Sequence, residues 1–143
     1  MKEKNSMTLT FPSLTQNEAF ARMAVSAFIM PLDPTISEIT DIKTAVSEAV
    51  TNAIIHGYEG ANGDVKIFCT YNKDEIFIEI TDFGKGIDDI EQAMAPLYTS
   101  KPELERSGLG FTVMETFMDR LEVISKLEDG TKVTMYKKLS GNS

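Results

Sequence analysis

Apolar and polar residues alternate with two different periods along this chain, and the changes of period predict its strands and helices. Over residues 7–11 the period is two, which predicts a half-buried strand that Pro12 ends and that lies at a sheet edge. Over about 16–30 the period is helical, and Pro31 closes the predicted helix. Its expected apolar face consists of Phe20, Ala24, Ala27 and Phe28.

The most sustained helical spacing follows Thr35 and extends over about 20 residues. Thr35 and Glu38 have the types and spacing of an N-cap with a capping box. Gly57 fits the position just after the last helical turn. We expect one stripe of this helix in the core, made by Ile36, Ile39, Ile42, Val46, Ala49 or Val50, and Ala53.

The second half of the chain has mainly the period of strands. Two hairpins are predicted, each with turn residues between its apolar runs. The expected strands are 65–71 with 75–81, and 121–127 with 131–138. Between the hairpins we expect a short helix over 88–94 and a helix from the glycines near 110 to about 119, whose apolar set is Val113, Met114, Phe117 and Met118. This order predicts an α+β fold, a two-layer sandwich with helices on one face of a mixed, mainly antiparallel sheet.

Length and composition fit a single globular domain over residues 1–143. Hydrophobic residues make up 42% and charged residues 25% of the chain, and the net charge is −8. This charge argues against general binding to nucleic acid or to anionic membranes. Cys69 is the only cysteine, so no internal disulfide forms, and we interpret it as a small strand residue. No apolar run reaches membrane-spanning length and no signal core follows Met1, so a cytosolic protein is expected.

Within the long predicted helix, Glu48 and Asn52 stand four residues apart, which places both side chains on one face. The apolar stripe lies beside this face, so the pair is close to buried surface. A carboxylate next to a carboxamide can bind a metal or accept a proton. Two ordinary solvated polar residues explain the spacing equally, and the helix alone does not decide between these interpretations.

Asp82 is the acid whose position most needs an explanation. Ile76, Ile78 and Ile80 share one face of their strand, and the same alternation continues that face to Asp82. A carboxylate that points toward the core is costly unless something donates hydrogen bonds to it. By the same alternation Thr131, on the last strand, is expected to face the core near Asp82.

Two glycine turns and one polar stretch complete the candidate site. Gly84 and Gly86 turn the chain after the first hairpin, and Gly108 and Gly110 precede a helix, whose first N–H groups favour anions. Between these turns, residues 95–107 are polar without a clear period. Such a stretch fits a lid or binding loop, and it fits a plain connector equally.

Arg22 is a candidate for contact with a partner protein. It is the only basic residue between Lys4 and Lys43, so it is the one positive feature of that surface if it projects outward. Glu18, four residues earlier, offers an ordinary solvated ion pair as the alternative.

The ordered set of these motifs resembles the ATP-binding boxes of the superfamily that includes gyrase, Hsp90, histidine kinases and MutL. The set comprises Glu-x-x-x-Asn in a helix, Asp-x-Gly-x-Gly after a strand, Gly-x-Gly before a helix, and Gly-Thr at the start of a strand, and it covers residues 20–133. Segments 46–57 (VSEAVTNAIIHG) and 96–111 (PLYTSKPELERSGLGF) are most similar to the anti-sigma-factor serine kinases, in particular their sporulation members.

This resemblance implies a role for each candidate residue. Glu48 would be the general base, Asn52 a ligand of Mg²⁺, and Asp82 the acceptor for the adenine amine. Adenine would then satisfy the core-ward carboxylate, and Thr131 would support the same pocket through a water. The remaining implied contacts with ATP or ADP are Gly84 and Gly86 at the base, and Thr99, Ser100, Lys101, Arg106, Ser107, Gly108 and Gly110 at the lid and phosphates. His56 is interpreted as a helix cap.

The implied activity is a switch that acts on other proteins. The chain would hold a sporulation sigma factor, sigma-F, inactive and use Mg-ATP to phosphorylate a serine of an anti-anti-sigma protein. No transducer domain and no phospho-accepting histidine helix accompany the boxes in this sequence, so the substrate is expected to be a separate protein. Family members are homodimers, and the 7–11 edge strand and the helix with Arg22 are the expected contact surfaces. The alternatives are a general-stress anti-sigma kinase, a nucleotide-gated binding module without kinase activity, and a free ATPase.

Overall fold

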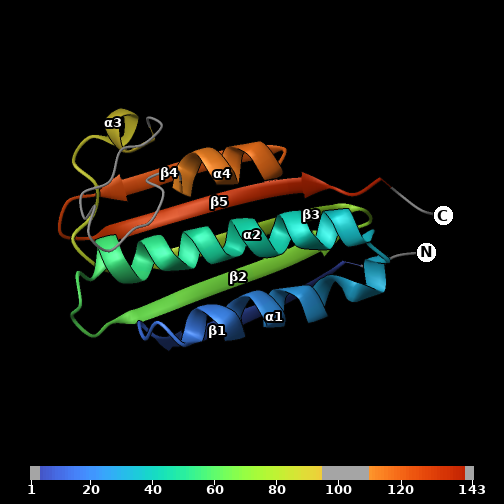
Figure 1. The fold of residues 1–143 in the computed structure, drawn as a ribbon, viewed down its shortest axis with the longest axis horizontal. Coiled ribbons are helices and arrows are strands. Elements are labelled where there is room, and N and C mark those ends of the chain that lie inside the picture. The colour runs from blue at the N-terminus through green and yellow to red at the C-terminus, as the bar shows by residue number, and fades with distance from the viewer. Residues whose placement is uncertain (1–3, 95–109, 141–143) are drawn as a thin grey trace.

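One antiparallel sheet forms a layer of the computed structural model, which describes residues 4–94 and 110–140 (Figure 1). Its five strands lie in the order β1-β2-β3-β5-β4, and all four pairings are antiparallel. The predicted fold class is confirmed, although the sheet is antiparallel throughout rather than mixed, because β5 lies between β3 and β4 and pairs antiparallel with both of them. The strands are β1 (Asn5–Pro12), β2 (Asp64–Asn72), β3 (Glu75–Asp82), β4 (Arg120–Lys126) and β5 (Gly130–Lys138).

Helices α1, α2 and α4 cover one face of this sheet, with α2 between the other two (Figure 1). The helices are α1 (Asn17–Ile29), α2 (Ile36–Asn52), the short α3 (Ile90–Met94) and α4 (Gly110–Phe117). Short 3-10 and π segments follow α1 and α2, over Met30–Leu32 and Ala53–Gly57. No helix of the described part of the chain is long and apolar enough to cross a membrane.

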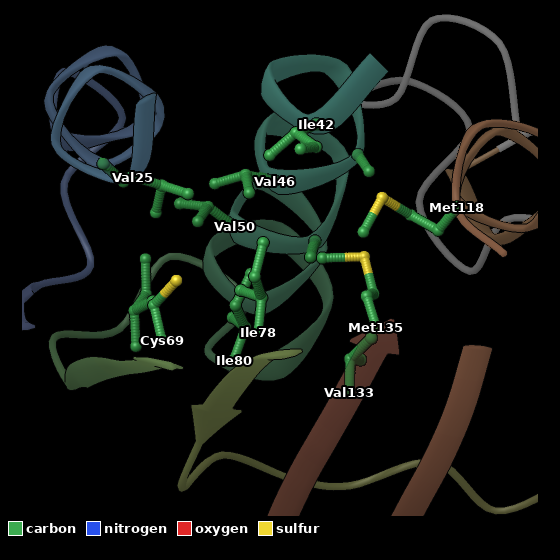
Figure 2. Packing of buried hydrophobic residues seen from close by; sticks show 14 of the residues in the cluster. Val25, Ile42, Val46, Val50, Cys69, Ile78, Ile80, Met118, Val133 and Met135 are labelled. Atoms are coloured by element: carbon green, nitrogen blue, oxygen red, sulfur yellow. The ribbon is translucent and has the colours of Figure 1, made fainter. Parts of the chain in front are cut away.

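The core lies between α2 and the inner face of the sheet (Figure 2). Ile42, Val46 and Val50 of α2 are buried in this core, as the predicted helical stripe requires, and Figure 2 shows Val46 and Val50 beside Val25 of α1. Cys69 lies on the inner face of β2, and burial raises the pKa of its thiol to about 12, in keeping with a structural residue.

The buried face of α1 is rotated by about one residue from the predicted one, although Phe28 packs against the core as expected. Phe20 is 52% exposed and Ala27 is exposed, whereas the buried face consists of Ala21, Val25, Ser26 and Ile29. The Phe20 ring packs edge-on against Phe11 of β1, with ring centroids 6.5 Å apart, instead of entering the core. Ala21, one residue later, is the fully buried position of this turn.

The start of α2 was predicted correctly and its end was not. Thr35 and Glu38 form the capping box, with the Thr35 N–H donating to Glu38 Oε1 at 2.8 Å and the Glu38 N–H donating to Thr35 Oγ1 at 3.1 Å. Ile36, expected in the core, is 86% exposed because it lies in the first, solvent-facing turn. Gly57 is not a left-handed cap: it ends the π turn, in which the Tyr58 N–H donates to the Ala53 carbonyl at 3.2 Å.

The strand register assigns different residues to the two ends of the sandwich. At the end near α3, Asp82 of β3 stands opposite Val65 of β2 and Thr131 of β5. We call this the turn end. At the opposite end, which we call the hairpin end, Glu75 stands opposite Asn72 and Lys138. The first residue of β1, Asn5, pairs with Tyr71, so β1 begins where β5 ends.

Candidate functional site

A cavity of about 470 Å³ opens at the turn end of the sandwich. This volume is within the usual range for pockets that hold small molecules and cofactors. The ends of α2 and β3, the turn after β3, the segment around α3, and the start of α4 form its wall. Its lining includes Ala49, Asn52, Ala53, His56, Gly57, Ile80, Asp82, Lys85, Gly86, Ile87, Asp88, Asp89, Gln92, Ala93, Gly110, Phe111, Leu127, Glu128, Thr131 and Val133.

Asp82 is the buried carboxylate of this cavity, as its alternation predicts. Its side chain is 5% exposed, and the Gly84 N–H donates to Asp82 Oδ1 at 2.9 Å. Burial raises the pKa of Asp82, and backbone hydrogen bonds from Gly84 and Thr131 act in the opposite direction. Within residues 4–94 and 110–140 no cation forms an ion pair with Asp82. The carboxylate therefore retains acceptor capacity toward the cavity.

The π turn brings the end of α2 directly against this carboxylate. A Cβ on Gly57 would lie 2.7 to 2.9 Å from the carboxyl atoms of Asp82, so only glycine fits there. The Gly57 carbonyl accepts the Lys85 N–H at 2.9 Å, and a Cβ on Gly84 would lie 2.0 Å from that same oxygen. Isolated π turns occur frequently at functional sites, because they redirect the residues that follow. Here the turn holds the helix end and the glycine turn together.

Further hydrogen bonds fix the glycine turn after β3 on both sides. Tyr58 Oη accepts the Phe83 N–H at 2.7 Å and donates to the Asp64 carbonyl at 2.5 Å. On the other side, the Lys85 carbonyl accepts the Glu128 N–H at 2.7 Å, from the turn that joins β4 to β5. These hydrogen bonds hold the glycine turn to Tyr58 on one side and to the β4–β5 turn on the other.

Gly86 has a second reason to be glycine. Its φ is +78°, in the left-handed region, and a Cβ there would lie 2.2 Å from the Lys126 carbonyl oxygen. Gly84 and Gly86 thus allow the turn to pass close to neighbouring backbone, and their predicted contact with a base stays a prediction.

Thr131 faces the cavity beside Asp82, as predicted, and its hydroxyl already has a partner. Thr131 is 8% exposed, and its Oγ1 lies 2.7 Å from Ser125 Oγ on β4. The Ile87 N–H, in the segment that leads to α3, donates to the same Ser125 Oγ at 2.7 Å. Ser125 was missed from the sequence, although the alternation Leu121, Val123, Ser125 marks it as facing inward.

The structure separates Glu48 from Asn52. Asn52 and Gly110 line the cavity, whereas Glu48 lines a second groove of about 440 Å³ between α1 and α2. Arg22 lines this same groove, with its Nη1 3.3 Å from Glu18 Oε2. The two residues of the predicted pair therefore face neighbouring spaces one helical turn apart. The ion pair that was the ordinary alternative for Arg22 exists, and Arg22 remains 39% exposed at its side chain.

Several predicted contacts lie outside the described residues, and they stay predictions. They are Thr99, Ser100, Lys101, Arg106, Ser107 and Gly108.

Sequence reasoning missed most of the polar rim of the cavity. His56, predicted to be a structural cap, lines the cavity from the π turn. Lys85 lines it from the glycine turn, and its Nζ lies 3.2 Å from Glu59 Oε2. Asp88 and Glu128 come from loops whose fold the hydrophobic pattern does not specify, so no signal in the sequence marks them.

Asn52 is the candidate metal ligand of the cavity. Within residues 4–94 and 110–140, no group of three or more His, Cys, Asp or Glu side chains is arranged to hold a metal ion. Mg²⁺ commonly binds through one or two protein oxygens, with phosphates and water as the other ligands. The cavity-lining carboxamide of Asn52 fits that mode of binding.

Comparisons of sequence show the family of this domain. A model of the histidine kinase-like ATPase domain matches residues 11–137. The anti-sigma F factor of Clostridium beijerinckii is 63% identical over 137 residues, which cover 95% of this chain and 96% of that protein. The anti-sigma F factor of Oceanobacillus iheyensis is 61% identical over 138 residues, which cover 96% and 94%.

Comparisons of structure support the fold. The RsbU and RsbW domains of a Mycobacterium tuberculosis protein match 94% of this chain with a TM-score of 0.69 at 18% identity, and the match covers 32% of that longer chain. The catalytic domain of the histidine kinase ThkA matches 93% of this chain and 96% of its own, with a TM-score of 0.58 at 17% identity. The chain thus has the two-layer fold of the histidine-kinase-like ATPases.

Proposed function

This chain belongs to the anti-sigma F factor family, whose domain is a histidine kinase-like ATPase domain, and from that premise we propose its reaction and partners. It binds Mg-ATP in the cavity at the turn end, phosphorylates a serine of an anti-anti-sigma protein, and holds the sporulation sigma factor sigma-F inactive. It acts in the cytoplasm, where sigma factors meet RNA polymerase.

The observation that carries the nucleotide site is the buried, cavity-facing carboxylate of Asp82. A carboxylate at 5% exposure is costly unless donors surround it, and within the described residues it receives backbone N–H groups from Gly84 and Thr131 but no cation. The exocyclic amine of adenine supplies the missing donor. Asn52 and the first N–H groups of α4, at Gly110, lie on the wall of the same cavity, where a metal and phosphates would bind.

In this proposal Glu48 is the general base. Bound ATP supplies the phosphoryl group and Mg²⁺ neutralises its charge. Glu48 lies one helical turn before Asn52, yet it lines the groove between α1 and α2 rather than the cavity. A serine of a partner protein would need to bind next to this turn of α2, where it would lie near both Glu48 and the phosphates beside Asn52. The carboxylate would accept the hydroxyl proton during transfer.

The partner surface in this proposal is the exposed side of α1. Arg22 lines the groove, and Phe20 and Met23 beside it are 52% and 56% exposed. Exposed large apolar side chains around a cation are typical of contacts between proteins. The homodimer of the proposal uses this helix and β1, whose outer edge is open within the described sheet.

Replacing Glu48 by alanine separates transfer from binding. We expect Glu48→Ala to bind ATP with an affinity within about threefold of the original, since Glu48 does not line the cavity, and to lose at least about 100-fold in serine phosphorylation. Calorimetry measures ATP binding, and transfer from radiolabelled ATP to the purified anti-anti-sigma protein measures catalysis.

The control is Glu122→Ala, which removes an exposed carboxylate on the opposite face of the sheet. Undiminished transfer by Glu48→Ala would remove Glu48 from the reaction. Transfer that stays absent in the original protein, despite tight ATP binding, would favour a binding module without kinase activity. ATP hydrolysis that does not depend on the anti-anti-sigma protein would favour a free ATPase.

A further inference from the structure

The groove between α1 and α2 contains two positive side chains, and only one of them has an acidic partner among the described residues. Arg22 of α1 pairs with Glu18 of its own helix, with Nη1 3.3 Å from Oε2. Lys43 of α2 forms no ion pair within residues 4–94 and 110–140. Lys43 is therefore the cation of this groove whose charge the described protein leaves without a partner.

Lys43 is also the main donor that this groove offers to an anion. Thr40 Oγ1 donates to the Ile36 carbonyl at 2.9 Å, and Thr44 Oγ1 donates to the Thr40 carbonyl at 2.8 Å. Each hydroxyl has one hydrogen, so neither threonine can also donate to a ligand. Ser47 follows Lys43 by four residues, on the same side of the helix, and its hydroxyl can donate beside the ammonium group. A carboxylate in the groove would therefore bind at Lys43.

The charge of the whole chain gives this lysine a selective role. The net charge is −8, so most of the surface does not attract an acidic segment of another protein. A cation without a partner attracts such a segment at one place only. Contacts of this kind fix the register and orientation of a bound segment more than they add to its affinity.

The separation of Lys43 and Glu48 along α2 sets the spacing of the residues that can contact both. The two residues are five positions apart, which is about 7.5 Å along the helix axis. An extended segment advances about 3.3 Å per residue, so two or three of its residues span this distance. A segment with a serine at Glu48 therefore has the residue two or three positions away beside Lys43.

We infer that Lys43 binds a carboxylate of the phospho-acceptor segment, two or three residues from the phosphorylated serine, and thereby places that serine at Glu48. The inference rests on the proposed kinase function and names its substrate class, a serine with an acidic residue at this spacing. Lys43 does not touch the reacting atoms. It contributes to binding of the acceptor rather than to the phosphoryl transfer step.

The test is steady-state transfer from radiolabelled ATP to the purified anti-anti-sigma protein. We expect Lys43→Met to raise the KM for this acceptor about tenfold, the usual effect of losing one hydrogen bond to a charged group, and to leave kcat within about twofold. Lys43→Glu should raise the KM further, because two carboxylates would then face each other. The ATP dissociation constant should stay within about twofold, since Lys43 does not line the cavity.

Substitutions in the acceptor identify the contact itself. Mass spectrometry locates the phosphorylated serine, and each Asp or Glu two or three residues from it is replaced by the corresponding amide. With one of these acceptors, Lys43→Met should change the KM less than about twofold, because its partner is already absent. A purely structural role of Lys43 would give the same tenfold rise with every acceptor.

Lys66→Met is the matched control, since it removes an exposed lysine on the outer face of β2, between the buried Val65 and Ile67. It should change neither kcat nor KM, and thermal unfolding verifies that each variant and acceptor folds. An acceptor without an acid at these positions, an unchanged KM for Lys43→Met, or an equal rise with every acceptor overturns the inference, while transfer by the original protein still supports the kinase. An original protein that transfers no phosphate overturns both.

Discussion

Two buried charged side chains lie at opposite ends of the same pair of strands, and only one of them is neutralised by the described protein. At the hairpin end, Lys137 of β5 is 9% exposed; its Nζ donates to the Phe117 carbonyl at 2.8 Å and lies 3.7 Å from Asp41 Oδ2. At the turn end, Asp82 of β3 is 5% exposed and receives backbone N–H groups, but no cation of the described residues.

The difference separates a structural charge from a functional one. Lys137 joins β5 to the end of α4 and to α2. At the end of α4 its positive charge also interacts favourably with the negative end of the helix dipole. Its hydrogen bonds are used within the fold. Asp82 faces a cavity with acceptor capacity remaining, and the protein carries the cost of its burial. Burial of a charged side chain alone therefore does not indicate a functional site. A buried charge that lacks an oppositely charged partner and faces a cavity does.

The largest expected effect comes from neutralising Asp82, the buried charge without a cation partner among the described residues. We expect Asp82→Asn to weaken ATP binding about 100-fold, because a hydrogen bond to a charged acceptor is lost and an amide group faces the amine. The free energy of unfolding at pH 7 should not fall. The pKa of Asp82 is raised above 3.8 in the folded state. Its ionisation therefore lowers the stability of the fold as the pH rises from 3.8 to beyond the folded pKa, and at pH 7 the uncharged Asn does not have this cost.

Calorimetry of ATP binding and urea unfolding measure these two quantities for Asp82→Asn. Glu79→Gln, on the outer face of the same strand, is the control and should change neither. A variant that binds ATP normally, or one that loses more than about 2 kcal/mol of stability, would place Asp82 in the same class as Lys137.

Removing the charge of Lys137 should have the opposite effect, a loss of stability without a loss of ATP affinity. Lys137→Met keeps most of the apolar stem, so we expect a loss of about 2 kcal/mol in the free energy of unfolding, for the hydrogen bond to Phe117 and the pairing with Asp41. The ATP affinity should stay within about twofold, because Lys137 is remote from the cavity lining. Urea unfolding compares it with Lys138→Met, an exposed neighbour. Weakened ATP binding without loss of stability would contradict the comparison.

The smallest effect concerns Glu38, a carboxylate that lies at the hairpin end, as Lys137 does. Burial would raise the pKa of Glu38, but hydrogen bonds from Thr35 and from the Ser140 N–H, at 2.7 Å, lower it below 4.5. The ionised form therefore stabilises the fold above pH 4.5, and this contribution is lost as the pH falls through the folded pKa. We expect Glu38→Gln to cost about 0.5 kcal/mol at pH 7.

Urea unfolding at a series of pH values tests the Glu38 prediction. The stability difference between Glu38→Gln and the original protein should shrink as the pH falls below 4.5. A difference that is constant with pH would show that the carboxylate contributes no more than an amide does at this capping box.

The sequence predicts best where one local rule determines the outcome. Strand alternation alone places Asp82 and Thr131 on the inner face, and the capping box locates the start of α2. The face of α1 could not be read, because Phe20, Ala21, Ala24 and Val25 offer two apolar stripes one residue apart, and only packing against α2 selects between them.

The candidate site shows the same division. Glu48 and Asn52 share a helix face in sequence, but where α1 lies decides that they line different spaces. A glycine at a helix end usually is a cap, and for this reason the sequence predicts a cap at Gly57. Its actual reason, contact with Asp82, depends on residues 25 positions apart that no local rule connects.

The hairpin end holds both the first residue of β1 and the last residues of β5, away from the cavity at the turn end. An attachment made at either place leaves the nucleotide entrance open. The molecule can therefore be immobilised on a sensor surface, or joined to a fluorescent reporter, through these strand ends, with the cavity free to report nucleotide binding in real time.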